Sequence, residues 1–320
     1  MTENTQKNFR SAIRWVKPLL AVAALLLILR EFSSALRQDW WSAFISSFQV
    51  GQRLPWLAAA MLLMPLNWLL ESIKWRRSVL HMEKVSYLTA LKGVLSGLSV
   101  SVFLPNRVGE YAGRVFVLRT ADRIQAALST MVAAFSQLII TLLLGTIAFT
   151  FYRPGFFGSF PVLSLSWLLA LTALILYFSV DAIVSRMPLR FIPKRLAHYR
   201  TAFSSLRPRV LALLLFQSLV RYLVFCFQFF CLLRFFNIAI GPLIAFGCIA
   251  VTYLVMAVVP TIALTELGVR GAVAVMVFAP FTELSEEVVF ASSLLWMVNL
   301  ILPALAGCFF ILKWKLVRSN

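Results

Sequence analysis

The stretch at residues 103–114, FLPNRVGEYAGR, interrupts a chain that is otherwise mostly apolar. It places a proline, an asparagine, two arginines, two glycines and a glutamate in one short run. If a helix begins after Asn106, then Arg107, Glu110 and Arg114 share one face, because residues three and four positions apart are neighbours on a helix. Such a break in an apolar chain needs a physical reason.

The composition is typical of integral membrane proteins. Of the 320 residues, 61% are hydrophobic and 13% are charged, whereas soluble domains have about 45–50% and about 25%. The apolar residues lie in runs close to the length of about 20 that crosses a hydrocarbon core. The predicted fold class is therefore an all-α polytopic integral membrane protein, with residues 1–320 forming a single transmembrane domain.

Most of the apolar runs are predicted to be membrane-spanning helices. The first follows a basic flank and is not followed by a small-residue cleavage site, so we interpret it as an uncleaved span. Two further apolar segments, at 86–120 and 264–281, are interrupted by proline, glycine and charge. The seven predicted spans are 16–36, 54–73, 124–151, 163–184, 210–235, 242–262 and 287–312.

Basic residues beside the spans predict the orientation, because Lys and Arg in short loops stay on the cytoplasmic side. Lys92 and Arg119 are both cytoplasmic only if the segment 86–120 enters and leaves on one side. We therefore predict a re-entrant hairpin that turns near Pro105; the alternative is a cytoplasmic loop followed by an interfacial helix. If 264–281 crosses as a short helix, there are about eight spans, and both termini are cytoplasmic in a multi-pass cell-membrane protein.

Prolines and glycines predict closely packed half-helices at these interruptions. Gly109 and Gly113 have the G-x-x-x-G spacing that lets another backbone approach closely. Irregular backbone at membrane depth is tolerated only inside protein or against a wet cavity, and in many transporters it forms the substrate site. The predicted structural residues at the hairpin, and at a broken segment around 260–270, are Pro105, Asn106, Gly109, Gly113, Pro260 and Gly268.

Charged residues in the predicted membrane segments are candidate substrate ligands, because burying a charge in hydrocarbon is costly. An E-x-x-x-R pattern occurs twice, at Glu110 and Arg114 and again at Glu266 and Arg270. This spacing places each acid beside its arginine on a helix. The candidate substrate-binding residues are Arg107, Glu110, Arg114, Arg221, Glu266 and Arg270.

Arg221 lies in the middle of a predicted span, where insertion of an arginine costs about 2.5–3.5 kcal/mol. We expect Glu110, Glu266 or a lipid phosphate to compensate it; the alternative is a buried ion pair with no role in transport. Glu71 is expected to pair with Lys74, three positions along the chain. Interhelical hydrogen bonds are expected from Asn67, Gln217, Gln228 and Asn299.

Signatures of enzymes and cofactor sites are absent from the sequence. It has 2 histidines and 4 cysteines, and neither these nor the scattered aspartates have the spacing of metal ligands or of a catalytic triad. We expect no enzyme activity, no metal and no cofactor. The formal charge of +18 does not predict nucleic-acid binding, because no soluble domain is available to present it.

The stretch at 186–209 is strongly basic, with interleaved aromatic and aliphatic residues. Such a segment binds an anionic leaflet, with each basic residue worth about 1 kcal/mol. The alternative is an ordinary solvated loop on the cytoplasmic side, where basic residues are enriched. Membrane lipids are therefore the first expected partners.

The sequence FLPNRVGEYAGRVFVLR resembles the P-x-R-x-G-E-x-x-R signature of the membrane region of lysylphosphatidylglycerol synthases and of the flippase-like proteins that consist of that region alone. Pro105, Arg107, Gly109 and Glu110 match this signature, and Arg114 matches with one extra residue of spacing.

The stretch LGVRGA resembles the second signature of the same family, a glycine-rich turn that ends G-V-R-E. This chain has Thr265 and Glu266 where the family has two glycines, and Gly271 where it has the final glutamate. Glu266, one turn earlier, is our candidate to replace that acid. The departure leaves the identity of the substrate open.

The resemblance implies a flippase for a lipid or a lipid-linked substrate. Because the chain ends at Asn320, close to the last predicted span, the aminoacyl-transfer activity of the fused family members is not expected. One alternative is a non-transporting scaffold or partner subunit of a lipid- or glycan-synthesising enzyme, with 186–209 as its docking surface. A membrane enzyme acting on polyprenyl or phospholipid phosphates is a third hypothesis, and a homo-oligomer or an enzyme partner is left open.

Overall fold

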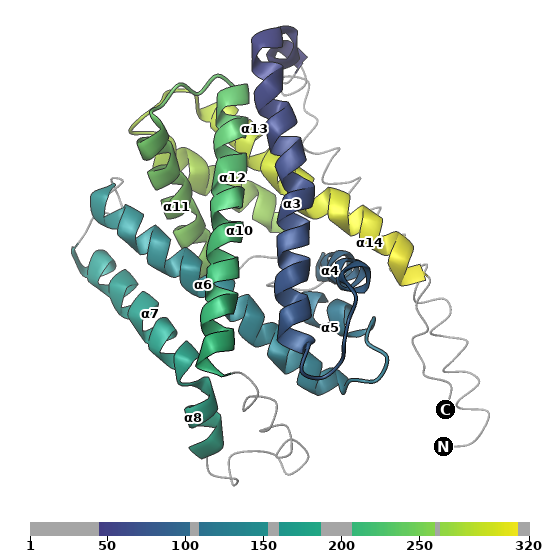
Figure 1. Cartoon of the computed structure of the whole chain (residues 1–320). Helices are drawn as coiled ribbons and strands as arrows, with labels where there is room; N and C mark the ends of the chain where they lie inside the picture. Colours follow the sequence, from purple (N-terminus) through teal and green to yellow (C-terminus); the bar gives the residue numbers. More distant parts are fainter. Residues whose placement is uncertain (1–44, 103–108, 153–159, 187–206, 260–262, 313–320) are drawn as a thin grey trace.

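The computed structural model describes residues 45–102, 109–152, 160–186, 207–259 and 263–312. Within these ranges the molecule is all-α and contains no β-strand, which confirms the predicted fold class (Figure 1). Outside the described residues lie the predicted first span at 16–36, most of the basic stretch at 186–209, and Pro105, Asn106, Arg107 and Pro260.

The described α-helices range from 7 to 29 residues in length. Their bounds are a 3₁₀ turn at Gly51–Arg53, α3 at Leu54–Val79, α4 at Tyr87–Ser101, α5 at Gly109–Val115, α6 at Arg123–Phe151, α7 at Phe160–Phe178, α8 at Val180–Arg186, α10 at Pro208–Phe235, α11 at Pro242–Val258, α12 at Ala263–Phe278, α13 at Ser285–Trp296, a π-helical turn at Met297–Ile301, and α14 at Leu302–Leu312.

Five helical segments are long and apolar enough to cross a membrane. They are Gly51–Val79, Arg123–Phe151, Pro161–Phe178, Pro208–Phe235 and Ser285–Ile311. The helices α11 and α12 have 17 and 16 residues, or about 25 Å at 1.5 Å per residue. This is shorter than a hydrocarbon core of about 30 Å, so a crossing by α12 stays a prediction.

The sequence accounts for where several helices begin. The side chain of Asp122 accepts hydrogen bonds from the backbone N–H groups of Ile124 and Gln125 and thereby caps α6. Ser86 caps α4 in the same way by accepting from the N–H of Thr89. The helices α10 and α11 each start with a proline in the first turn, where its missing N–H costs nothing.

The helices α4 and α5 form the closely packed pair that their glycines predict. A Cβ atom on Gly113 would meet the backbone of Gly97, and one on Gly109 would meet the backbone of Val100. On the opposite side, Gly307 of α14 lies against the backbone of α4. Only glycine permits such an approach, so these residues act in packing, and Gly109 and Gly113 belong to α5 itself rather than to a turn.

Gly268 is a correction to the predicted break. It lies inside α12, and a Cβ atom added to it would meet nothing within 4 Å. The apolar pattern that continues through α12 overrides the helix-weakening effect of a single glycine. Gly268 therefore neither turns the chain nor permits a close contact within the described residues.

A carboxylate outside the spans ties two connections together. Glu83, between α3 and α4, accepts hydrogen bonds from the backbone N–H groups of Arg119, Thr120 and Ala121 and from the Thr120 hydroxyl. Partial burial favours the neutral form, but these donors favour the anion more strongly, so the pKa of Glu83 lies below its ordinary value. The anchor holds the connection between α3 and α4 against the connection between α5 and α6.

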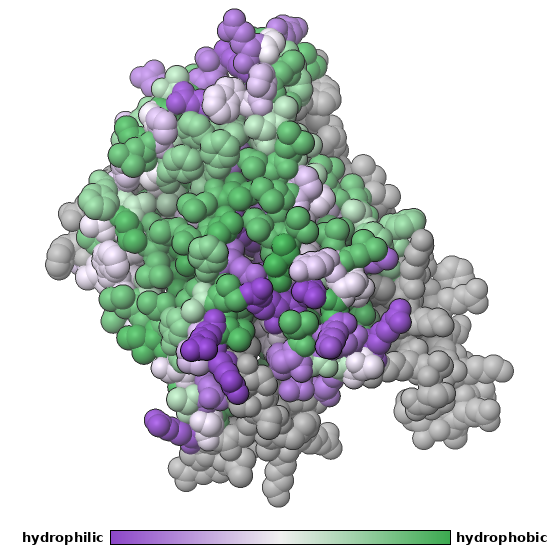
Figure 2. All heavy atoms as spheres, viewed as in Figure 1, coloured by the Kyte–Doolittle hydropathy of each residue, from purple (hydrophilic) through white to green (hydrophobic). Residues whose placement is uncertain are grey.

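Two hydrophobic clusters flank the polar centre of the bundle. The larger one joins α6, α10, α11, α12 and α13 through buried aromatic residues such as Phe229 and Phe278. The smaller one surrounds Trp75 and includes Trp296 and Leu300. Figure 2 shows that the outer face over α6, α7 and α10 is mostly apolar, as a lipid-facing surface requires.

Candidate functional site

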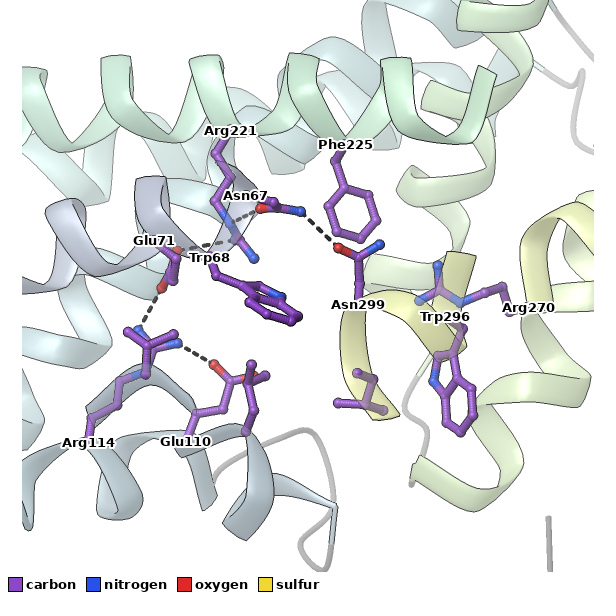
Figure 3. A pocket seen from close by; sticks show the side chains of 13 residues that line it. Asn67, Trp68, Glu71, Glu110, Arg114, Arg221, Phe225, Arg270, Trp296 and Asn299 are labelled. Atoms are coloured by element: carbon purple, nitrogen blue, oxygen red, sulfur yellow. Dashed lines mark hydrogen bonds and ion pairs between the residues drawn. The ribbon is translucent and has the colours of Figure 1, made fainter. Parts of the chain in front are cut away.

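A buried cluster of charges lies where α3, α5 and α10 meet. Glu71 is its centre: its Oε1 accepts from Arg114 at 2.6 Å, and its Oε2 lies 3.0 Å from Lys74 and 3.2 Å from Arg221. The Glu71 side chain is 7% exposed. One carboxylate therefore pairs with three cations that come from three helices, two of which, Arg114 and Arg221, are drawn in Figure 3.

Arg114 joins the hairpin to α3. Its second amino group donates to Glu110 at 2.5 Å, so the predicted i,i+4 pair is confirmed. The guanidinium thus bridges Glu110 and Glu71, the planar fork being suited to two carboxylates. This contact fixes the short helix α5 against a long span.

Arg221 has a different partner from the one expected. It pairs with Glu71 rather than with Glu110 or Glu266, and it also donates to Asn67 at 2.8 Å and to Gln137 at 3.3 Å. The prediction was wrong for these two acids, because Glu71 was assigned by its spacing to Lys74, with which it also pairs; compensation by a lipid phosphate stays a prediction. Packing of α10 against α3 brings the arginine to the same carboxylate.

A ladder of amide side chains continues from Arg221 towards the last span. Asn67 donates to Asn299 at 3.2 Å, Asn299 donates to Gln228 at 2.9 Å, and Gln228 donates to the carbonyl of Ala60 at 2.9 Å. The interhelical hydrogen bonds predicted for these three amides are confirmed. Asn299 lies in the π-helical turn, a distortion that often occurs at functional sites.

The second E-x-x-x-R pair is also formed. Arg270 donates to Glu266 at 2.6 Å, and the side chains are 10% and 7% exposed. The Arg270 guanidinium lies 6.0 Å from the ring centroid of Tyr253, within the range of a cation–π contact. This pair of α12 is therefore buried, and its Arg270 faces the same cavity as the cluster around Glu71.

These groups surround a single cavity of about 60 Å³. Four of the six predicted substrate-binding residues line it, Glu266 reaches it only through its bond to Arg270, and Arg107 lies outside the described residues. Figure 3 shows the ring of Trp68 between the end formed by Arg114 and the end formed by Arg270. The lining residues are Asn67, Trp68, Glu71, Val94, Leu98, Glu110, Arg114, Arg221, Phe225, Arg270, Trp296, Asn299 and Leu300.

The candidate residues from sequence did not include Trp68, Trp296 or the central role of Glu71. One signal was available for Glu71: it lies four positions after Asn67 in an apolar span, so both face the same side of α3. Tryptophans in an apolar chain carry no comparable signal. Their position in the site depends on which helices become neighbours.

Among the described residues, the cluster carries one excess positive charge. Lys74, Arg114 and Arg221 face the carboxylates of Glu71 and Glu110, while Arg270 and Glu266 balance each other. Within the described ranges, no group of histidine, cysteine or acidic side chains has the arrangement of a metal site. The chemistry available here is the binding of a charged group, by ion pairs and hydrogen bonds.

A family model described as the lysylphosphatidylglycerol synthase TM region matches residues 14–307. The chain belongs to this family. The match includes both interrupted segments and every cavity-lining residue of this lysylphosphatidylglycerol synthase membrane region. Neither the curated proteins nor the solved structures gave a match.

Proposed function

We propose that this membrane region moves a lipid or a lipid-linked substrate across the cell membrane, with the headgroup passing through the cavity centred on Glu71. The observation that carries the proposal is the convergence of Glu110, Arg114, Arg221 and Arg270 on one cavity inside an apolar bundle. Ionisable residues at membrane depth mark substrate pathways by default, because their burial is costly. Three of them, Glu110, Arg114 and Arg270, belong to the interrupted segments, where transporters commonly bind substrate.

The size of the cavity indicates a closed conformation. A cavity of about 60 Å³ holds only a few water molecules, far less than a lipid headgroup requires. Transport then requires the surrounding helices to separate. The short helices α5 and α12 hold charges at the cavity and are the natural moving parts.

A route to the cavity is available from the lipid-facing side. Figure 2 shows hydrophilic side chains gathered between the lower halves of α10 and α3, with apolar surface above them. Arg221 belongs to α10 and its side chain is 25% exposed, whereas the side chains of Arg114 and Glu71 are 5% and 7% exposed. A headgroup that enters here meets Arg221 first while its acyl chains stay in the bilayer.

The orientation belongs to the same proposal. The hairpin of α4 and α5 is re-entrant from the cytoplasmic side, both termini are cytoplasmic, and the basic stretch at 186–209 lies on the anionic leaflet. The region acts as a transporter without enzymatic activity. The basic residues that flank α4 and α6 support this orientation through the positive-inside rule.

Transport of fluorescent lipids in proteoliposomes tests the proposal. Arg221→Gln and Glu110→Gln are expected to reduce the rate of movement at least about tenfold, because each removes a buried charged hydrogen bond worth about 1.5–3 kcal/mol. Arg234→Gln is the matched control on the same helix. Arg234 donates to the carbonyl of Ile240 near the end of α10 and does not line the cavity.

Unchanged transport by folded Arg221→Gln and Glu110→Gln proteins would contradict the proposal. The charges would then only hold the bundle together, as expected for a scaffold or partner subunit of a lipid- or glycan-synthesising enzyme. Monodisperse elution in detergent establishes that each variant is folded. Normal transport by the control variant Arg234→Gln would show that loss of an arginine from α10 is not by itself enough to slow transport.

A further inference from the structure

We infer that the cavity takes an anionic, phosphate-bearing lipid headgroup that lacks a cationic group. This inference rests on the proposed function and names the substrate class of the same site. It depends on which hydrogen-bonding atoms of the cavity lining have partners and which do not.

Four buried donors of the lining have no acceptor within the described part of the chain. They are the indole N–H groups of Trp68 and Trp296 and the Nε–H groups of Arg114 and Arg270. Three of these residues are also almost wholly buried, with 4% exposure for Arg114, 8% for Arg270 and 6% for Trp296. Buried donors are normally satisfied, so four in one cavity indicate a ligand that supplies acceptors.

The carboxylates of the same cavity already face cations. One oxygen of Glu71 accepts a hydrogen bond from Arg114, and the other makes no hydrogen bond but lies within ion-pair distance of Lys74 and Arg221. Glu110 also accepts from Arg114.

The amide oxygens are committed in the same way. That of Asn67 accepts from Arg221, and that of Asn299 accepts from Asn67. An ammonium group carries only donors and would compete for carboxylates that already balance cations.

Phosphate matches the remaining atoms. Its oxygens are acceptors only, and arginine forms charge-assisted hydrogen bonds with it. The one excess positive charge among the described cluster residues favours an anion for the same reason. The tryptophans contribute N–H donors together with apolar ring faces, which suits the junction between a phosphate and its lipid chains.

The sequence also argues against a cationic headgroup as the substrate. Where the family signature has an acid after the arginine, this chain has Gly271, and Glu266 is bonded to Arg270 instead of lining the cavity. The free carboxylate that a cationic headgroup would need is therefore not provided by α12.

Lipid binding to the purified full chain in detergent tests the inference. The probes are phosphatidylglycerol, a polyprenyl phosphate, zwitterionic phosphatidylcholine and cationic lysylphosphatidylglycerol, with inorganic phosphate as a competitor. Retention is measured by native mass spectrometry, and tryptophan fluorescence reports on the indoles at the cavity. Both anionic lipids share the required phosphate, and the comparison between them distinguishes a phosphodiester from a phosphomonoester.

The variants remove donors without leaving an unpaired charge. The double variant Glu266→Gln with Arg270→Gln removes the cation together with its acid, and Trp296→Phe removes one indole N–H. We expect anionic lipids to bind about tenfold more weakly to the double variant and the fluorescence change to diminish in Trp296→Phe. Trp167→Phe is the control, because Trp167 lies on α7 and donates to Thr150.

Each outcome decides between the two proposals. Preferred binding of lysylphosphatidylglycerol would overturn the inference and leave lipid transport standing. Equal binding of all probes, or no effect of the double variant, would show that the donors are satisfied by water only and would also overturn it. If an anionic lipid binds, and binding is weakened by the double variant, but the protein does not move this lipid in proteoliposomes, the inference is supported and the transport function is contradicted.

Discussion

Glu71 makes ion pairs with Lys74, Arg114 and Arg221 at 3.0, 2.6 and 3.2 Å. A buried ion pair contributes little net stability compared with apolar residues of the same shape, because desolvation offsets the attraction. Removal of one partner is different, since it leaves the others charged and unpaired. At the scale of the residue, Glu71 is thus the position where a single change disturbs the largest number of charges.

Glu71→Gln is predicted to destabilise the bundle by about 3–5 kcal/mol, because it leaves three buried cations with Glu110 as the remaining acid of the described cluster. The measurement is the melting temperature in detergent. The double variant Glu71→Gln with Lys74→Met removes one charge of each sign and should recover part of the loss. Equal melting of Glu71→Gln and the wild type would show that Glu71 is not the centre of the network.

At the scale of the element, the glycines of α5 and α12 have opposite surroundings. A Cβ on Gly113 would lie 2.5 Å from the Cα of Gly97, whereas one on Gly268 would meet nothing within 4 Å. Backbone atoms cannot move aside as the end of a side chain can. The same substitution therefore has opposite consequences in two helices of the same site.

Gly113→Ala is predicted to destabilise the protein by about 1–3 kcal/mol through overpacking of the hairpin. Gly268→Ala should stabilise it by about 0.5–1 kcal/mol, because alanine restricts the unfolded chain and fits a helix. Thermal melting of the two variants side by side is the measurement. Equal effects of the same sign would refute the close packing of α4 and α5.

The Glu83 anchor predicts a dependence on pH. Its folded pKa lies below the ordinary value of 4.5, so its stabilisation is fully present above that value and is lost as the pH falls through the folded pKa. Because the anchor is partly exposed, it is worth about 1 kcal/mol. Glu83→Gln should melt below the wild type at pH 7, and the difference should vanish in acid; a constant difference would contradict the anchor.

At the scale of the whole molecule, the face over α6, α7 and α10 is mostly apolar, and the polar cavity inside the bundle is too small for a headgroup in this conformation. The hairpin of α4 and α5 lies between α3 and α14, and movement of α4 relative to α14 is a direct way to enlarge the cavity. The Ser99 hydroxyl of α4 donates to the carbonyl of Ala304 at 2.5 Å and also interacts with the thiol of Cys308.

Ser99→Cys therefore places a thiol next to the native Cys308, and we expect the two to form a disulfide on oxidation. Oxidation is predicted to lock α4 to α14 and to stop lipid movement in proteoliposomes, and reduction should restore it. The oxidised wild type is the control. A fully cross-linked protein that transports at the normal rate would show that α4 and α14 do not separate during transport.

Local patterns in the sequence predicted the membrane class, most of the helices, the family and both E-x-x-x-R pairs, because these depend on neighbours along the chain. Only the tertiary structure decided that Glu71 pairs with Arg221 and that Trp68 and Trp296 line the cavity. These contacts join α3, α5, α10 and α13 across more than a hundred residues in some cases. Which helices become neighbours depends on packing of whole apolar faces, and no short pattern encodes it.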